Sequence, residues 1–330
     1  MNLYTYCSNN PIKYTDPTGH WGTSVHVNKT KEWATEEFND YIDDEAAKID
    51  IYKRDKKGNI IYKNGKKQED PKKVEARDTW VEDQKEKVDG YVEALVAGDH
   101  YVDQESTIFK RVKFAGDDIF HGVNGLSFTG TTTGLKDKNP YNFINERKDT
   151  AATILTNNSY NKNTAINDYI VTPAKTILKN NTSATAASMK AIESDLTDKT
   201  VTKKVGKKTI TETVNVFKDA PTYDIATKYM SGKDATKETT ALFVLGMGLH
   251  SQQDIQAHGM QATPHEPTDH NDDVKWDYNE KTGWTQGGTR IKQTKTDTIT
   301  YIDTFLYGDG TDDNPEYGSY LFTPYSPPEK

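Results

Sequence analysis

The sequence predicts a mainly α-helical protein with two inserted β-hairpins. This prediction rests on segments with helical spacing of apolar residues, on two lysine-rich stretches with glycine turns at their centres, and on one long apolar helix. With 330 residues the chain can bury a large core, although only 33% of its residues are apolar. We therefore expect exposed insertions and an irregular tail beside a helical core.

The first twenty residues form a separate unit in the sequence. They read as two short strands, with one turn at Asn9-Asn10-Pro11 and another at Asp16-Pro17-Thr18-Gly19. The pattern Asn-Leu-Tyr-x-Tyr-x-x-Asn-Asn-Pro-x-x-x-x-Asp-Pro-x-Gly resembles the end of the RHS/YD-repeat core, where the last repeat precedes a variable C-terminal toxin. This resemblance implies that residues 1–20 are a short β remnant of the RHS core and that the toxin region of a polymorphic toxin begins at Trp21.

Helical segments are predicted on both sides of the first lysine-rich stretch. Residues 29–48 place four aromatic or aliphatic side chains at helical intervals, which predicts a buried face. These side chains are Trp33, Phe38, Tyr41 and Ile42. Residues 78–96 and 151–196 are also expected to be mostly helical, with interruptions at Asn/Thr clusters and at Pro173.

Two lysine-rich stretches predict exposed β-hairpins. In residues 51–67 the Gly58-Asn59 turn separates two runs that contain Ile and Tyr, and Asn64-Gly65 forms a second turn. Seven basic residues and one acidic residue give this stretch a net charge of +6, and residues 200–211 repeat the arrangement with a net charge of +4. Such lysines could contact anionic lipid or nucleic acid, but lysine also protects exposed strands from edge pairing, which is how we interpret them here.

Residues 234–257 form the strongest predicted helix. They contain the longest apolar run, nine residues that end at Leu249, which is far shorter than the ~20 residues that a membrane span needs. Asp234 is the expected N-cap of this helix. Residues 297–307 predict one more helix or strand, and the proline-rich tail from Asp309 is expected to be irregular or disordered.

Three polar side chains share one face of this helix. His250, Asp254 and His258 follow one another at intervals of four residues, and each interval turns the helix face by only about 40°. The same face continues backward through apolar and small residues. Gly246 and Gly248, each of which is unfavourable inside a helix, suggest close approach by another backbone. A buried His and Asp are costly unless they are paired or bind a metal, and their side chains suit zinc. The row therefore predicts a metal site, which Gln252 and Gln253 could help to orient. The alternative is that His250 and Asp254 form a satisfied pair in the core without a metal.

The same residues carry a second resemblance. The pattern Gly-Leu-His-x-x-Gln-Asp-x-x-Ala-His-Gly is similar to the helix of zinc-dependent phospholipase C and the related zinc nucleases, which are all-helical enzymes with a three-zinc cleft. This resemblance implies that His250 and Asp254 are zinc ligands and that His258 is the next ligand. We therefore expect a helical toxin domain in residues 21–288, around a cleft with one or more zinc ions, and a C-terminal extension in residues 289–330.

Further site residues are expected in three other places. His265 and Asp269 repeat the His-x-x-x-Asp spacing in the acidic loop after the helix. The resemblance also implies ligands from an early helix, for which His26 is the candidate. In the Asp-Asp-Ile-Phe-His stretch, His121 is a candidate ligand and Asp118 a candidate base that positions or deprotonates water. The alternative for each of these residues is an ordinary surface or turn position.

Composition and missing motifs narrow the function. A net charge of −8 argues against attraction of nucleic acid over the whole surface, and a single cysteine, Cys7, excludes an intrachain disulfide and cysteine-based zinc sites. The sequence contains no phosphate-binding glycine loop and no nucleophile elbow. Together with the predicted metal site, the resemblance to zinc-dependent phospholipase C implies a zinc-dependent phosphodiester hydrolase of the phospholipase C type. The alternatives are a metal-dependent nuclease on the same fold and a non-catalytic helical module that metal stabilises.

The resemblance to polymorphic toxins also implies a setting and partners. We expect an antibacterial toxin that is secreted or delivered as part of a larger protein, because the first residues have no signal peptide. The expected partners are the upstream RHS repeat shell, a cognate immunity protein, and a phospholipid or nucleic acid substrate. No transmembrane segment is predicted.

Overall fold

The computed structural model is mainly helical with two small antiparallel sheets, as the sequence predicts. The described residues are 24–102, 140–180, 190, 193–205, 208–257, 289–308 and 315–327. The helices in chain order are η2 (Ser24–Lys29), α1 (Thr30–Lys48), α2 (Pro71–Tyr101), α4 (Pro140–Thr156), η4 (Asn167–Val171), α5 (Thr172–Asn180), α7 (Pro221–Met230), α8 (Lys237–Ala257), α10 (Thr289–Tyr307) and α11 (Gly318–Leu321). The strands are β1 (Tyr62–Lys63), β2 (Lys66–Lys67), β3 (Lys199–Val205) and β4 (Lys208–Val214).

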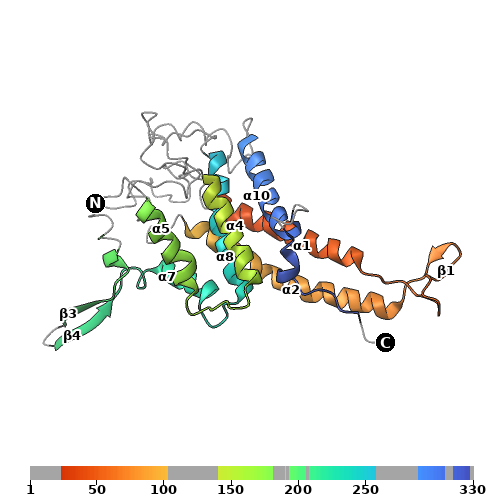
Figure 1. The fold of residues 1–330 in the computed structure, drawn as a ribbon, viewed down its shortest axis with the longest axis horizontal. Coiled ribbons are helices and arrows are strands. Elements are labelled where there is room, and N and C mark those ends of the chain that lie inside the picture. Colours follow the sequence, from red (N-terminus) through yellow and green to blue (C-terminus); the bar gives the residue numbers. More distant parts are fainter. Residues whose placement is uncertain are drawn as a thin grey trace.

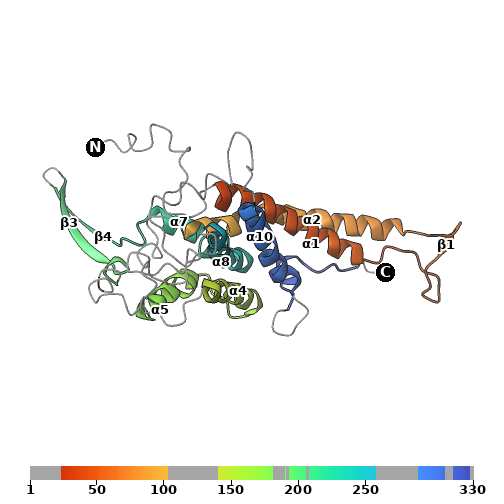
Figure 2. The same ribbon diagram turned by 90° about the horizontal axis from the view of Figure 1, so that it is seen from above.

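Helix α8 is the centre of the fold. It packs most extensively along α2 and α4, and α7 and α10 also contact it (Figures 1 and 2). Between Thr240 and Ile255 every residue of α8 is buried except Gln252, which is partly exposed. A helix that is apolar around most of its circumference needs neighbours on all sides. The apolar run that ends at Leu249 is therefore core.

Glycines allow α2 and α8 to approach backbone to backbone. A Cβ atom on Gly246 would overlap the carbonyl oxygen of Leu95, and a Cβ atom on Gly98 would overlap the carbonyl oxygen of Phe243. No larger residue fits at either position unless the two helices move apart. The expected close approach of another backbone is confirmed at Gly246, whereas a Cβ atom on Gly248 would first overlap the side chains of Tyr301 and Arg147.

Helix α8 begins later than predicted. The Thr236 hydroxyl accepts a hydrogen bond from the Thr239 backbone N–H at 3.2 Å, and the Thr239 hydroxyl accepts one from the Thr236 N–H at 2.9 Å. This reciprocal pair satisfies N–H groups that would otherwise be free at the start of the helix. The prediction of Asp234 as the N-cap is therefore wrong.

The helices around the first hairpin agree with prediction and extend it. Residues 29–48 are helical, and the four side chains predicted for their buried face are all buried. Helix α2 is longer than the predicted 78–96. It starts early because Asp70 accepts a hydrogen bond from the Lys72 N–H at 3.1 Å and Pro71 occupies the first helical turn.

The segment 151–196 is interrupted at a cluster of Asn and Thr residues, as predicted. Helix α4 ends at Thr156, before η4 and α5 follow. Between them, the Asn157 side chain accepts a hydrogen bond from the Ser159 N–H at 2.7 Å. The side chain of Asn161 does the same for the N–H two residues later, at 3.0 Å. These local bonds compete with the helical pattern and break the helix.

Both lysine-rich stretches form hairpins, as predicted. Strands β1 and β2 pair across Asn64-Gly65, where φ is 51° and 75° as a tight hairpin turn requires. At Gly58 φ is 86°, and this turn brings Arg54 opposite Ile60. Strands β3 and β4 form the second hairpin. The two hairpins extend from the helical body at opposite ends of the molecule (Figure 1).

The C-terminal tail is largely irregular where it is described, but it is packed against the helices. Phe322 is buried and stacks on Tyr41, with ring centroids 5.6 Å apart. The Trp80 indole N–H of α2 donates a hydrogen bond to the Thr323 carbonyl at 2.7 Å. The tail therefore contributes to the core. The segment 297–307, predicted as either a helix or a strand, is helical and forms part of α10.

Two further points complete the fold. The β remnant predicted for residues 1–20 lies outside the described residues. Within the described ranges, none of the helices combines the length and the apolar character that crossing a membrane requires.

The contact between α2 and α8 can be tested by substitution. Gly246→Ala should destabilise the protein by about 3 kcal/mol, because the new methyl group would force the two helices apart. Gly90→Ala is the matched control: Gly90 also lies inside a helix, but a Cβ there has nothing within 4 Å. The control should stabilise the protein by up to about 1 kcal/mol. Urea unfolding measures both, and equal effects of the two variants would contradict the close contact.

Candidate metal centre

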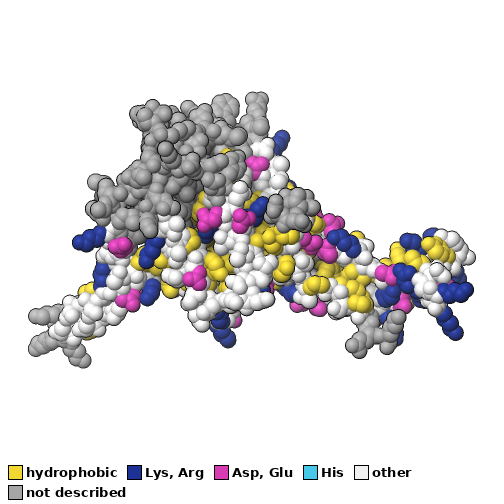
Figure 3. All heavy atoms as spheres, viewed as in Figure 1, with side chains coloured by type: hydrophobic (Ala, Val, Ile, Leu, Met, Phe, Trp, Pro, Cys, Tyr) yellow, Lys and Arg dark blue, Asp and Glu magenta, His cyan; other side chains and the backbone are white. Residues whose placement is uncertain are grey.

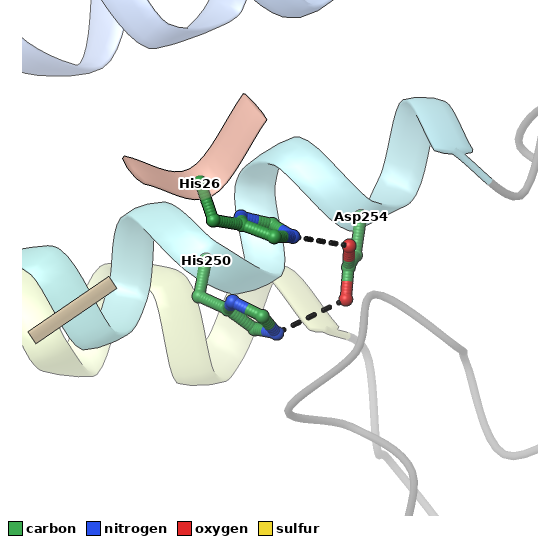
Figure 4. A group of neighbouring side chains, drawn as sticks. All are labelled: His26, His250 and Asp254. Carbon is green, nitrogen blue, oxygen red and sulfur yellow. Dashed lines mark ion pairs between the residues drawn. The ribbon is translucent and has the colours of Figure 1, made fainter. Parts of the chain in front are cut away.

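Two imidazoles and a carboxylate meet in the interior of the protein. His26 comes from η2, and His250 and Asp254 come from successive turns of α8. One ligand atom from each residue lies within 4.8 Å of the other two, and all three side chains are fully buried. Figure 4 shows both rings directed at the same carboxylate. Three of the predicted ligands are therefore brought together.

Each of the two histidines directs its Nε2 atom at one oxygen of the Asp254 carboxylate. His26 Nε2 lies 3.3 Å from Oδ1 of Asp254, and His250 Nε2 lies 3.1 Å from Oδ2 (Figure 4). The rings stack, with centroids 4.3 Å apart and an angle of 30° between their planes. Nε2 of His26 has no hydrogen-bond partner among the described residues. A ligand nitrogen thus points at a carboxylate without a normal hydrogen bond to it.

Asp99 of α2 lies beside the Nδ1 atoms of both rings, on the side away from Asp254. Its Oδ1 lies 2.9 Å from His26 Nδ1 and 3.3 Å from His250 Nδ1, and its side chain is fully buried. Sequence analysis did not identify this residue. A signal was present, because Asp99 lies four residues after Leu95 and seven after Val92, both buried, and so continues the buried face of α2.

A hydrogen-bond network assigns the proton on the His26 ring. The Gln253 side-chain amide donates to the hydroxyls of Thr30, at 2.8 Å, and Thr298, at 3.1 Å. Its carbonyl oxygen then accepts from His26 Nδ1 at 2.8 Å, and Asp99 beside it can only accept when ionised. Nδ1 of His26 therefore carries hydrogen, and Nε2 is the nitrogen available to a metal. Of the two glutamines predicted to orient the rings, Gln253 lies in this network, whereas Gln252 is partly exposed.

The electrostatics of the cluster favour a positive charge between the carboxylates. Burial lowers the pKa of His26, but the charge of Asp99 and the close contacts with Asp254 and Asp99 outweigh it and hold this pKa well above its usual range. Burial raises the pKa of Asp99, but the charge of His26 and the bonds from both histidines outweigh it and keep this pKa below its usual range. The cluster thus stabilises a positive charge on His26 beside the ionised Asp99 carboxylate.

The spacing of the donor atoms suits a small ion. Zinc binds nitrogen and carboxylate oxygen at about 2.0–2.1 Å in a tetrahedron, which places neighbouring ligand atoms about 3.3 Å apart. The two nitrogen to oxygen distances, 3.3 and 3.1 Å, are close to that value, but they involve different oxygens of Asp254, and the three ligand atoms lie within 4.8 Å of one another. A hydrogen on Nδ1 held by an acid is the usual support for a histidine that binds metal through Nε2.

Comparisons with known proteins add no further assignment. No protein-family model, no curated protein and no solved structure matches the chain. The remaining predicted site residues lie outside the described part of the chain. They are Asp118, His121, His258, His265 and Asp269. Their predicted roles stay predictions.

Replacing Asp99 tests its role as the support of both rings. Asp99→Asn removes the charge that holds the two Nδ1 atoms, so zinc affinity should fall by about 10–100-fold. Competition with a fluorescent zinc chelator measures this affinity. The control Asp149→Asn removes a carboxylate from an exposed position on α4 and should leave the affinity unchanged. Equal affinities for both variants would show that Asp99 does not support the site.

Metal binding should release protons near neutral pH. Because the pKa of His26 is raised, the ring is protonated in the metal-free protein at pH values below that raised pKa, and zinc must displace this proton. Affinity should therefore fall as the pH falls, by about tenfold per pH unit for each proton released. Calorimetry in buffers with different ionisation enthalpies counts the protons. Binding without proton release would contradict a ligand role for His26.

Proposed function

We propose that this chain binds zinc through His26, His250 and Asp254. The observation that carries the proposal is the geometry of the cluster, in which two Nε2 atoms face the two oxygens of one buried carboxylate at 3.3 and 3.1 Å. The donor set supports zinc, because imidazole and carboxylate are ligands that zinc accepts, and the described cluster contains no thiolate. Two carboxylates, from Asp254 and Asp99, would balance the charge of a divalent ion.

We further propose that the zinc is catalytic. Structural zinc sites usually use four protein ligands, whereas catalytic sites use three and keep one position for water or substrate. Three ligand residues from the described part of the chain follow the catalytic pattern. The predicted ligands His121, His258, His265 and Asp269 could hold additional zinc ions, as the resemblance to zinc-dependent phospholipase C implies.

The reaction we propose is hydrolysis of a phosphodiester. Zinc at this site would lower the pKa of a bound water toward about 7 and neutralise the oxygens of a phosphoryl group. Residues of the chain would orient the ligands and activate the water. Asp99 and Gln253 orient the two imidazole rings, and Asp118 is the candidate base. A phospholipid is the favoured substrate because of the resemblance to phospholipase C, and a nucleic acid is the alternative on the same fold.

The setting we propose is that of a polymorphic toxin. The proposal is supported by the pattern in residues 1–20 that resembles the end of an RHS core. The toxin would be secreted or delivered as part of a larger protein and used in competition between bacteria. An upstream RHS shell and a cognate immunity protein would be its partners.

One observation favours a second candidate, a non-catalytic module that metal stabilises. All three proposed ligands are fully buried. A cavity of about 530 Å³ reaches Val27 and His100, which are neighbours in sequence of His26 and Asp99, but none of the proposed ligands lines it. A closed site of this kind would stabilise the fold without admitting a substrate.

Activity measurements separate the two candidates. Purified protein should contain zinc and should hydrolyse phosphatidylcholine vesicles or single-stranded nucleic acid. His250→Ala or Asp254→Ala should lower this activity by about two orders of magnitude or more, because each removes a proposed ligand while the fold remains. Gln252→Ala, on the same helix but partly exposed, is the matched control and should retain activity.

The outcomes have distinct meanings. Full activity in metal-free protein would disprove the zinc hydrolase proposal. Bound zinc with no hydrolysis of either substrate, together with a lower melting temperature after zinc removal, would support the non-catalytic candidate. Circular dichroism of each variant establishes that the fold is intact.

A further inference from the structure

The exposed hydrophobic side chains gather on the two hairpins. Six large hydrophobic residues are exposed among the described residues, and four of them belong to the lysine-rich stretches. The four are Ile61, Tyr62, Val201 and Ile210. Isolated hydrophobic residues on a protein surface are normal. Here, however, most of the exposed ones gather on the two basic hairpins, and this grouping calls for an explanation. Protection from edge pairing accounts for the lysines and leaves the exposed apolar residues unexplained.

The first of these projections joins α1 to α2, and we call residues 51–67 the basic arm. All seven of its basic side chains are exposed. They are Lys53, Arg54, Lys56, Lys57, Lys63, Lys66 and Lys67. The arm projects beyond the ends of α1 and α2 in both ribbon views (Figures 1 and 2). In Figure 3 dark blue side chains surround an apolar patch at this end of the molecule.

The positive charge of the arm is largely unneutralised within the protein. Arg54 pairs with Asp50 at 3.0 Å, but none of the six lysines of the arm forms an ion pair with a described residue. The one carboxylate in the arm, Asp55, accepts hydrogen bonds from the N–H groups of Lys57 and Asn59 at 2.8 and 2.9 Å and so stabilises the turn. The lysines are therefore available to an outside partner.

Charge is segregated along the molecule. The arm carries +6 while the whole chain carries −8, so the remainder of the chain carries −14. Helix α2, with 31 residues, is about 46 Å long, which is several times the screening length of about 8–10 Å at physiological salt. An anionic surface that touches the arm is therefore screened from most of the acidic body. The molecule should approach such a surface with the arm first.

We propose that the basic arm docks the protein on an anionic phospholipid bilayer, with Ile61 and Tyr62 entering the headgroup region. Tyr is favoured at this interface, and an aliphatic side chain gains from burial there. Six of the seven cations are lysine, which acts as a point charge on a diffuse anionic surface, whereas recognition of individual phosphates favours arginine. These features favour a lipid surface over a nucleic acid. The proposal does not rest on the metal centre.

Vesicle co-sedimentation of the full chain tests the docking. The protein should bind vesicles of phosphatidylcholine mixed with phosphatidylserine, and binding should weaken with salt and be much weaker on pure phosphatidylcholine. Lys56→Ser combined with Lys57→Ser should weaken binding by about 5-fold for each lysine removed. Lys175→Ser combined with Lys292→Ser removes the same charge from exposed helical positions outside the arm and should have no effect.

A second pair of variants tests the apolar part. Ile61→Ser combined with Tyr62→Ser should weaken binding by about 10-fold while its salt dependence remains. These side chains are 39% and 58% exposed, so the fold should survive, which circular dichroism checks. His250→Ala should bind vesicles like the parent protein, so failure of the zinc proposal and failure of docking are distinguishable. Equal binding by the arm variants and the control pair would overturn the proposal, and so would arm-dependent binding to nucleic acid without binding to vesicles.

Discussion

The backbone contact between α2 and α8 is the constraint on which the candidate metal centre depends. Gly246 lets α8 approach α2 at the Leu95 carbonyl and the Asp99 N–H, one helical turn before His250. At this separation the Asp99 carboxylate reaches the Nδ1 edges of both rings. One packing contact therefore serves the core and the site together, and widening it by a single methyl group would disturb both.

The cluster also explains why the interior tolerates so many ionisable groups. Two carboxylates and two imidazoles are buried together, and a buried charge without a partner would be strongly destabilising. A divalent cation between neutral rings would balance Asp99 and Asp254. In the absence of a cation, protonation supplies the balance, which agrees with the raised pKa of His26. If a metal ion replaced the proton on His26, the charges of Asp99 and Asp254 would therefore stay compensated.

The helical body and the hairpins follow different physical rules. Helix α8 is buried along nearly all of its length, and even the tail packs through Phe322 onto Tyr41. The hairpins bury little and present lysines next to exposed Ile and Tyr or Val side chains. The positive charge is concentrated on the arm, which carries +6, while the remainder of the chain carries −14.

The sequence by itself determined the helical class, the two hairpins, and the placing of His250 and Asp254 on one buried helical face. These features depend on local periodicity, turn residues and charge, which act over a few neighbouring residues. Only the tertiary structure decided that Asp99 supports both rings and that His26 completes the cluster, because His26 lies 73 residues from Asp99 and 227 from Gln253. Periodicity shows which face of a helix is buried. Which buried faces meet is decided by the packing of helices far apart in the chain, here by the glycine contact between α2 and α8.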